Sequence, residues 1–510
     1  MSRVNRNILA NFVGKGWAGV AALVFTPVYL GSLGVETYGL IGIFVATQTI
    51  LAAFDFGLST ALNRELARYH DPSADVQALR ELARSVELLY WGGAVCIGVV
   101  GSMIAPWIAG QWIGARSLSD DATIHALWLM VWAVALQWPF LCYAGGLGGL
   151  QKQVALNKLI AAMATVRWGG AAVVVLVIPG SVESFFAWQM VTSLVGTWLG
   201  GRLLWQGLGN PRRLARIQFS SLHGIRRFAA AVWGTSAIGI LLSQLDKIVL
   251  SKLLSLQQFA YYSLAATVAT VVYIGVVPVV TAVFPRLTEL LGGKNKDETY
   301  QTFHRACRLV ALLVLPLSWT LAVFSNDIIE LWTHSREVAQ HSGLLARLIV
   351  MGTMLNALLQ LPYALLLAYG NAQFWLYVNV VSLLLLVPAL FFLTIHFGAV
   401  GAPFAWIALN LGYFLVAAPR MPIPRQELSR WFWKDVAVPF AVAGLAVLLI
   451  RALRPAPAHG WVEEAFWVGL AFAISFAAVF VALGRSVSGF LSGQGDIRPN
   501  PKPAAGNEAD

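Results

Sequence analysis

Apolar segments long enough to cross a lipid bilayer recur along this chain from its first residues almost to its last. Hydrophobic residues make up 58% of its 510 residues and charged residues only 12%, and the mean hydropathy is +0.70. A soluble domain of ordinary composition carries about a quarter charged residues. An apolar helix of about 20 residues spans a hydrocarbon core. The sequence therefore predicts an all-α polytopic membrane protein.

Fourteen membrane-spanning helices are predicted from these segments. Their approximate ranges are 8–31, 38–62, 86–109, 123–148, 159–179, 184–205, 228–250, 259–284, 306–325, 344–368, 375–396, 401–419, 436–453 and 465–483. The loops between them are all short, which excludes a folded soluble domain of the usual size. Whatever this chain does is expected to happen within the membrane.

The positive charges are distributed unevenly about the predicted spans. When residues near a span end are counted with the adjoining loop, 26 of the 35 Lys and Arg fall on one side, five on the other and four within spans. Cytoplasmic loops of membrane proteins collect Lys and Arg. The asymmetry therefore predicts that both termini are cytoplasmic, and it explains the net charge of +11 without a nucleic-acid partner. Cys96, Cys142 and Cys307 lie in apolar segments, so no disulfide framework is implied, and the N-terminus lacks a signal-peptide cleavage pattern.

One stretch occurs twice, first from Phe25 to Tyr69 and again from about Gln244 to Leu290. In each copy an apolar span ends, a short linker follows, a second span begins, and an arginine lies just past its end. The matched landmarks, about 220 residues apart, are Leu30 with Leu250, Leu33 with Leu253, Tyr38 with Phe259, and Arg64 with Arg286. An internal repeat of this length in a membrane protein predicts two homologous lobes around one central site.

The predicted organisation follows from the repeat. We expect a six-helix lobe over 1–205, a basic cytoplasmic linker over 206–227, a second six-helix lobe over 228–419 and two additional transmembrane helices over 420–485. The Gly/Pro-rich tail, 486–510, is expected to be disordered and cytoplasmic. The sequence does not indicate a role for the two additional helices.

Charged residues inside the predicted spans are candidates for function, because each costs about 2.5–3.5 kcal/mol at mid-helix. Those singled out, away from the span ends, are Lys15, Asp55, Arg167, Asp246, Lys247 and Arg347, four basic and two acidic. Arg64 and Arg286 lie at equivalent ends of the repeat. Together these residues predict a hydrated, net-cationic cavity that accepts an anionic group, since the arginine fork can hold phosphate or carboxylate bidentately.

Structural roles remain open for most of these residues. Arg64 and Arg286 could be anchors that contact lipid headgroups. Asp55, which precedes Phe56 and Gly57, could bond across helices to hold a kink. Asp246 and Lys247 could pair with other polar groups, and Arg167 could neutralise an aspartate. Gln48, Gln137, Gln244, Asn356 and Gln360 could line the cavity or join helices, with joining as the default.

Enzyme signatures are absent from the sequence. There is no P-loop, the eight histidines show no metal-ligand spacing, and many of the tryptophans lie near span ends, as an interfacial belt does. We therefore expect no catalysis, no cofactor and no metal.

Four stretches carry a resemblance to a known family. They are VYLGSLGVETYGLIG (28–42), FDFGLSTALNRELARY (54–69), LDKIVLSKLLSLQQFAYYSLA (245–265) and PRLTEL (285–290). With them the chain resembles the polysaccharide-biosynthesis flippases of the multidrug/oligosaccharidyl-lipid/polysaccharide exporter superfamily. The resemblance implies two six-helix lobes, fourteen spans and a cationic central cavity, with Lys15, Arg64 and Arg286 as candidates for binding diphosphate or acidic sugar. The sequence departs from the family in one place, because LSKLLSLQQF has no glycine where the second linker often carries one.

The resemblance implies an alternating-access flippase that moves a polyprenyl-diphosphate-linked oligosaccharide from the cytoplasmic to the periplasmic leaflet of a bacterial inner membrane. H+ or Na+ as coupling ion, membrane lipids and a polysaccharide polymerase are possible partners. A multidrug antiporter and a peptidoglycan lipid-precursor flippase of the same superfamily are the alternatives. The antiporter is expected to rely on carboxylates, whereas bases outnumber acids here. A membrane glycosyltransferase or polymerase would need a longer loop than the predicted spans leave.

Overall fold

The computed structural model describes residues 3–69, 71–114, 118–209, 215–293, 295–416, 418–421, 423–455 and 460–484. These residues are almost entirely helical, and the one β-contact recorded among them is an isolated bridge between Gly114 and Ser255. The predicted all-α class is confirmed. The predicted disordered tail, 486–510, lies outside the described residues, and so does the side chain of Lys15 on the first helix.

The first part of the chain forms the following helices. They are α1 (Arg3–Leu33), α2 (Val35–Ala53), α3 (Leu58–Leu66), α4 (Val76–Gln111), α5 (Asp120–Gln137), α6 (Phe140–Gly149), α7 (Gln153–Ala164), the π-turn η1 (Thr165–Gly169), α8 (Gly170–Val177), α9 (Val182–Gly207) and the 3-10 helix η2 (Phe219–Gly224).

The second part continues in the same manner. Its helices are α10 (Arg226–Leu253), α11 (Leu256–Thr270), α12 (Val272–Gly292), α13 (Lys296–Val323), α14 (Ser325–Thr333), α15 (Arg336–Ala368), α16 (Ala372–Phe397), η3 (Gly398–Val400), α17 (Gly401–Val416), η4 (Ala418–Arg420), α18 (Arg425–Arg430), the π-helical η5 (Trp431–Ala437), α19 (Val438–Leu453) and α20 (Trp461–Leu483).

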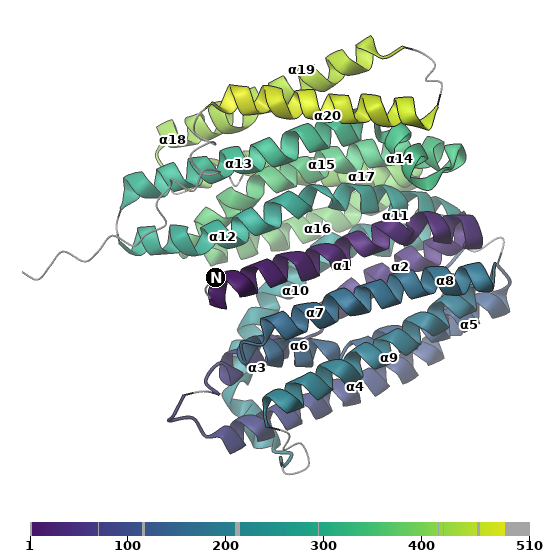
Figure 1. Ribbon diagram of the computed structural model, residues 1–510, viewed down its shortest axis with the longest axis vertical. Helices are drawn as coiled ribbons and strands as arrows, with labels where there is room; N and C mark the ends of the chain where they lie inside the picture. Colours follow the sequence, from purple (N-terminus) through teal and green to yellow (C-terminus); the bar gives the residue numbers. More distant parts are fainter. Residues whose placement is uncertain are drawn as a thin grey trace, which may run out of the picture.

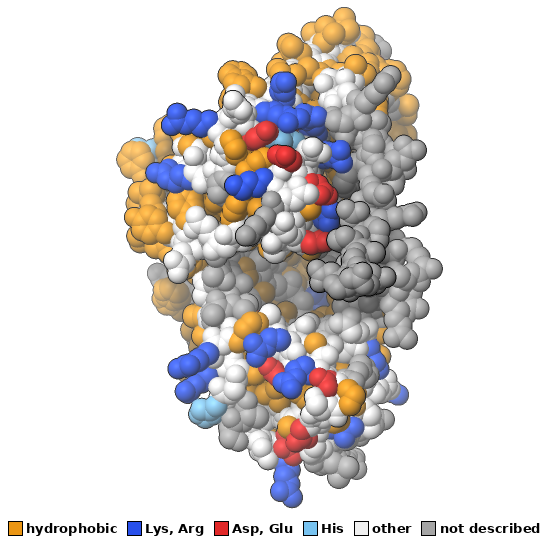
Figure 2. Space-filling model, turned by 90° about the vertical axis from the view of Figure 1, so that its left-hand side faces the viewer, with side chains coloured by type: hydrophobic (Ala, Val, Ile, Leu, Met, Phe, Trp, Pro, Cys, Tyr) orange, Lys and Arg blue, Asp and Glu red, His pale blue; other side chains and the backbone are white. Residues whose placement is uncertain are grey.

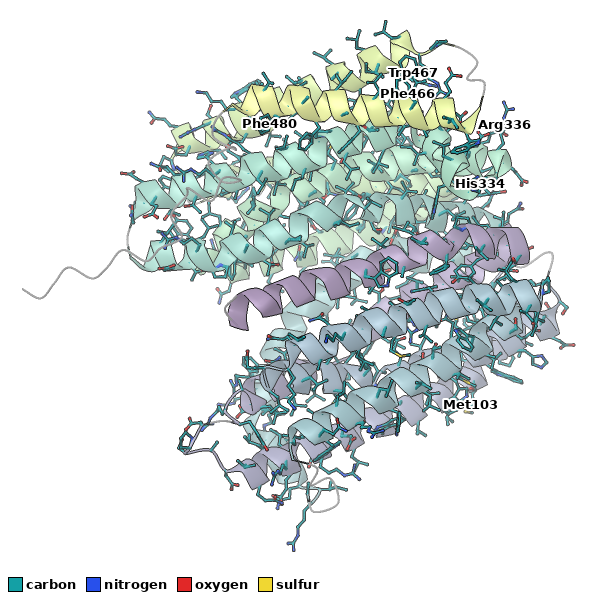
Figure 3. All side chains as sticks on the ribbon, in the orientation of Figure 1. Met103, His334, Arg336, Phe466, Trp467 and Phe480 are labelled. Atoms are coloured by element: carbon teal, nitrogen blue, oxygen red, sulfur yellow. The ribbon has the colours of Figure 1, made fainter. Side chains whose placement is uncertain are left out.

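The helices support a multi-pass membrane protein. Within the described ranges, eleven segments are long and apolar enough to cross a membrane. Helices α9, α10 and α11 are not among these segments, and one segment contains both α16 and α17. The predicted total of fourteen spans is therefore not confirmed and stays a prediction. Large apolar side chains cover the outer surface: Met103 on α4 is 76% exposed and Phe466 on α20 is 59% exposed (Figure 3), as expected for a surface that faces lipid.

The helices are arranged as two halves stacked along the long axis (Figure 1). Helices α3 to α9 lie in one half and α11 to α20 in the other, with α1, α2 and α10 between them. Contact between the halves runs mainly through α2, which packs against both α10 and α11. This arrangement fits the two lobes that the repeat predicts, although the predicted lobe boundaries stay a prediction.

The two ends of the bundle differ in charge. We call the end that carries the starts of α1, α4 and α10 the basic end, and the other the opposite end. The basic end lies at the left of Figure 1, and Figure 2 shows Lys and Arg side chains gathered on it over both halves. This is the side to which the sequence assigns most Lys and Arg.

Both copies of the repeat form a long helix, a tight turn and a second, interrupted helix. In the first copy α1 ends at Leu33 and α2 begins at Val35; in the second, α10 ends at Leu253 and α11 begins at Leu256. The second turn needs no glycine, because Ser255 caps α11 by accepting a hydrogen bond from the backbone N–H of Gln258 at 3.3 Å. The missing glycine in the linker is thus explained.

The predicted second span is broken between α2 and α3. Phe56 and Gly57 there have φ values of +51° and +70°, in the left-handed region that glycine adopts freely and phenylalanine rarely does. The corresponding interruption between α11 and α12 is confined to Val271, which stays in the right-handed helical region. The break in the first copy is the larger departure from a continuous helix.

Candidate functional site

The halves pack closely at the opposite end, where α2 meets α11. A Cβ built on Gly39 would lie 2.5 Å from the carbonyl oxygen of Leu256, and one built on Gly42 would lie 2.5 Å from Oγ of Ser263. Real Cβ atoms do not approach other atoms so closely. Only glycine at these two positions lets the helices come this near.

Further contacts hold the same end together. The backbone N–H of Leu256 donates to the carbonyl of Gly114 at 3.2 Å, and the indole of Trp112 donates to Oγ of Ser251 at 3.1 Å. The indole of Trp332 donates to the carbonyl of Leu23 at 2.9 Å, joining α14 to α1. The opposite end is therefore closed in this conformation.

At the basic end, the break between α2 and α3 contacts the start of α10. A Cβ on Gly57 would lie 2.2 Å from the carbonyl oxygen of Ala229. The ring of Phe56 lies 5.3 Å from that of Trp233, and the Trp233 indole donates to the carbonyl of Ala53 at 2.6 Å. The first helix of the second half is thus attached to the interrupted helix of the first.

Arg64 on α3 and Arg286 on α12, the matched arginines of the repeat, both pair with carboxylates. Arg64 Nη2 lies 2.6 Å from Glu65 Oε1, and its guanidinium lies 4.2 Å from the ring centre of Phe228. Arg286 lies 3.0 Å from Glu289 and 2.5 Å from Glu298. Their side chains are 51% and 32% exposed, respectively, so both guanidinium groups are accessible to solvent.

Asp55 lies in the break and is held by neutral hydroxyl groups. Ser59 Oγ donates to Oδ2 at 2.8 Å, and the Tyr90 hydroxyl donates to Oδ1. The bond to Tyr90 joins the break to α4. This geometry favours the kink-holding role for Asp55 over direct contact with substrate.

Arg167 lies on the π-turn η1 and bonds to uncharged groups. Its Nη1 donates to Oε1 of Gln137 at 2.8 Å and its Nη2 donates to Oγ of Ser193 at 3.0 Å. Gln48 donates to the same Gln137 oxygen at 2.6 Å. The suggestion that Arg167 neutralises an aspartate is wrong for the described residues, because its partners are an amide and a hydroxyl; the guanidinium bridges α5 and α9 instead.

Asp246 and Lys247 line a cavity in the second half. Lys247 Nζ lies 3.6 Å from Asp246 Oδ2, which also accepts a hydrogen bond from the Tyr262 hydroxyl at 2.5 Å. The cavity has a volume of about 210 Å³, and its wall is formed by α10, α11, α12, α15, α16 and α17. Its polar lining also includes Tyr273, Thr353 and Trp406.

A hydrogen-bonded amide network lies beside this cavity. Tyr273 donates to Oδ1 of Asn356 at 2.8 Å, Asn356 donates to Oδ1 of Asn410 at 2.8 Å, and Gln360 donates to Asn356 at 3.0 Å. Asn410 is fully buried. These bonds join α12, α15 and α17, which is the structural role that the sequence favoured for Asn356 and Gln360.

The structure places the predicted site residues in separate clusters. Asp246 and Lys247 are adjacent, whereas Asp55, Arg64, Arg167 and Arg286 each have partners of their own. The contacts of the described residues do not bring these clusters together into one site, so a role in binding substrate stays a prediction for all of them, and for Lys15.

The sequence analysis overlooked two buried charged clusters. Glu87, 1% exposed on α4, pairs with Arg84 at 2.6 Å and accepts from Tyr143 at 2.8 Å and Trp205 at 3.3 Å. Its place inside the predicted span 86–109 was a signal that could have revealed it. The second cluster surrounds His304, whose acidic partners lie more than 120 residues away in the chain and carry no local signal.

Comparison with known proteins identifies the family to which this chain belongs. The sequence profile described as "Polysaccharide biosynthesis protein" matches residues 4–291, more than half of the chain. The chain belongs to this family. A second profile, MatE, matches residues 232–392.

A curated relative and two solved structures are similar to this chain. The Shigella flexneri protein named "Putative O-antigen transporter" is 20% identical over 409 residues, which cover 79% of this chain and 93% of that protein. The lipid II flippase MurJ, in an inward closed conformation, superposes with a TM-score of 0.72 at 12% identity, covering 93% of this chain and 98% of MurJ. A MATE multidrug-resistance transporter in an inward-facing conformation superposes with a TM-score of 0.66 at 13% identity, covering 81% and 96%. At these identities the two structures show the shared fold alone.

Proposed function

We propose that this protein is a flippase that moves a polyprenyl-diphosphate-linked oligosaccharide from the cytoplasmic to the periplasmic leaflet of a bacterial inner membrane. The observation that carries the proposal is the family match over residues 4–291, and the O-antigen transporter relative supports the same class of cargo. A polar headgroup needs a hydrated, charged path, whereas the polyprenyl tail can remain in lipid beside the protein.

The arrangement of contacts supports alternating access. The halves are joined closely at the opposite end through α2 and α11, and at the basic end through α10 and the α2–α3 break. If the basic end faces the cytoplasm, as its Lys and Arg suggest (Figure 2), this conformation is closed toward the periplasm. Both termini then lie on the cytoplasmic side.

The matched arginines are the proposed recognition groups for the diphosphate. Arg64 and Arg286 come from opposite halves, and both pair with carboxylates of their own half that an incoming anion can replace. A diphosphate offers the arginine fork stronger bidentate partners than a single carboxylate does. Lys15 is proposed as a third cation on the path. Asp55, Arg167, Asp246 and Lys247 are proposed to shape it, and Asp246 also to respond to a coupling H+ or Na+.

The test is the leaflet distribution of lipid-linked oligosaccharide in cells that lack the protein. Accumulation on the cytoplasmic leaflet with loss of surface polysaccharide is expected. Rescue should fail with a Lys15→Ala, Arg64→Ala, Arg286→Ala triple variant. It should succeed with Arg68→Ala, Arg425→Ala, Lys434→Ala, which removes the same charge from exposed positions at the same end.

Other outcomes distinguish the alternatives. Normal surface glycans with increased sensitivity to cationic drugs would favour a multidrug antiporter. Accumulation of peptidoglycan lipid precursor, with the other lipid-linked glycans unchanged, would favour a peptidoglycan-precursor flippase. Full rescue by the Lys15, Arg64, Arg286 triple variant would leave the flippase in place but overturn its proposed recognition groups. A dependence on a polysaccharide polymerase would appear as loss of flipping when the polymerase is deleted.

A further inference from the structure

His304, on α13, lies buried between two carboxylates from the segment that leads into the additional helix pair. Its side chain is 2% exposed. Its Nε2 lies 2.9 Å from Oε2 of Glu427 on α18, and its Nδ1 contacts Oδ2 of Asp435 on η5. The two ring nitrogens thus face one carboxylate each.

This geometry fixes the number of protons that the three side chains hold. A neutral imidazole carries one N–H and can donate to one carboxylate only. Two contacts between ring nitrogens and carboxylate oxygens need two hydrogens, which requires either an imidazolium or a neutral imidazole with one protonated carboxyl. The three groups therefore hold one proton more than a neutral histidine beside two carboxylates.

The two carboxylates differ in burial and in the cations that they contact. Asp435 is fully buried and also accepts from Arg308 Nε at 2.7 Å. Glu427 is 27% exposed, and its second cation, Arg430, is 3.6 Å away and 43% exposed. Cys307 on α13 lies close to Asp435, whereas Lys434, which precedes Asp435 on η5, is exposed. The ion pairs of Arg286 with Glu289 and Glu298, on α12 and α13, form a separate network.

We propose that His304, Glu427 and Asp435 form a proton-dependent latch that fastens α18 to α13. When the extra proton leaves to the solvent beside Glu427, one contact sets an imidazole lone pair against a carboxylate and becomes repulsive. Glu427 is the contact that opens, because Arg308 still holds Asp435. Its helix, α18, forms the first six residues of a helical segment that continues through η5 into α19, so loss of this contact releases the end of that segment.

The sign of the pH dependence follows from the proton count. The latched state binds one more proton than the released state, so its stability is greatest at low pH and is lost as the pH rises. At the other end of the helix pair, Arg454 joins Asp327 of α14 at 2.5 Å without a histidine. Only the basic end of the pair is therefore expected to respond to pH.

The test is hydrogen–deuterium exchange of the full-length protein in detergent at several values from about pH 5 to about pH 9. Exchange rates are divided by the intrinsic rate at each pH. The peptide over 425–434 should lose protection about tenfold or more as the pH rises, as for loss of one hydrogen bond to a charged group. The peptide over 325–333, in α14, is the internal control and should keep its protection.

Two variants separate the latch from a general effect of pH. In Glu427→Gln the amide can donate to a neutral ring nitrogen, so α18 should stay protected at every pH. In Glu427→Ala it should be unprotected at every pH. Wild-type protection that does not change with pH would overturn the proposal, and so would a Glu427→Gln variant that responds to pH as the wild type does. None of these readouts depends on transport. The latch can therefore be disproved without affecting the proposed flippase activity, and the flippase activity can be disproved without affecting the latch.

Discussion

The indole of Trp233, on the first helix of the second half, donates a hydrogen bond to the backbone carbonyl of Ala53, 2.6 Å away in the first half. In a continuous helix that carbonyl would accept from the N–H four residues later. Because α2 ends at Ala53, the carbonyl is available to the other half. The break in the helix therefore creates the contact that joins the halves at the basic end.

Gly57→Ala is expected to weaken this joint. A side chain at φ +70° costs about 1–2 kcal/mol, and its Cβ would also lie 2.2 Å from the Ala229 carbonyl. We expect a lower thermal unfolding temperature and loosened contact of α10 with the break. The control is Gly370→Ala, which has φ +80° but open space around it and so carries the backbone cost alone. Equal destabilisation by the two variants would show that the contact with Ala229 contributes nothing.

Gly42→Val is expected to open the opposite end. The added side chain would collide with Ser263 on α11, and overpacking of this kind costs about 1–3 kcal/mol. A shift of this size lowers the population of the closed state about tenfold. Spin labels at positions 36 and 258, on α2 and α11, should report a longer distance in the variant than in the wild type.

Gly31→Ala is the matched control for the same measurement, because no atom of another residue lies near its added Cβ. A wild-type distance distribution in Gly42→Val, with the protein folded, would contradict the role of the α2–α11 contact as the closed gate.

Much of the fold was predictable because it depends on hydrophobic length and on the repeat. Each predicted span overlaps one or more described helices, although the second is broken between α2 and α3 and the total of fourteen stays a prediction. The repeat landmarks Arg64 and Arg286 lie on α3 and α12, in opposite halves. The break at 54–57 was only suggested by Asp55, Phe56 and Gly57, because the residues that pack against it lie on α10, some 170 residues later. Local sequence does not specify such a partner.

The candidate site was less predictable than the fold. A charge inside an apolar span signals that a partner exists, but not whether that partner is a substrate or a neighbouring side chain. Arg167 illustrates this, since its partners Gln137 and Ser193 are neutral residues on two other helices. His304 carried no signal at all, because it lies just outside a predicted span and its partners come from the additional helices.

Arg167→Met is expected to destabilise the first half through loss of its two hydrogen bonds, each worth about 1.5–3 kcal/mol when one group is charged. Gln137→Leu should destabilise it through the same network. In a double-mutant cycle, the combined variant should lose clearly less stability than the sum of the single variants, because the shared bond is removed only once. Additive losses, measured by thermal unfolding, would show that Arg167 and Gln137 act separately.

The ion pair between Arg454 and Asp327, at the opposite end, is expected to attach the additional helices firmly to α14. Arg454, 8% exposed, pairs with Asp327 at 2.5 Å and with Glu464 at 3.7 Å, and so joins α14, α19 and α20. In Arg454→Met the mostly buried Asp327 carboxylate keeps only the more distant Arg451 as a cation, and breaking a buried ion pair costs about 3–5 kcal/mol. We expect a marked fall in unfolding temperature and faster hydrogen exchange at the start of α20.

Arg451 provides the comparison, because it approaches the same Asp327 at 3.8 Å but is 46% exposed. An exposed pair contributes about 0–1 kcal/mol. Arg451→Met should therefore change the unfolding temperature little, although it removes the same charge from the same helix. If both variants lost stability equally, the net charge around Asp327, rather than the buried pair, would hold the additional helices in place. A loss confined to Arg454→Met would identify the buried pair as the fixed end of the helix pair, opposite the end that His304 holds.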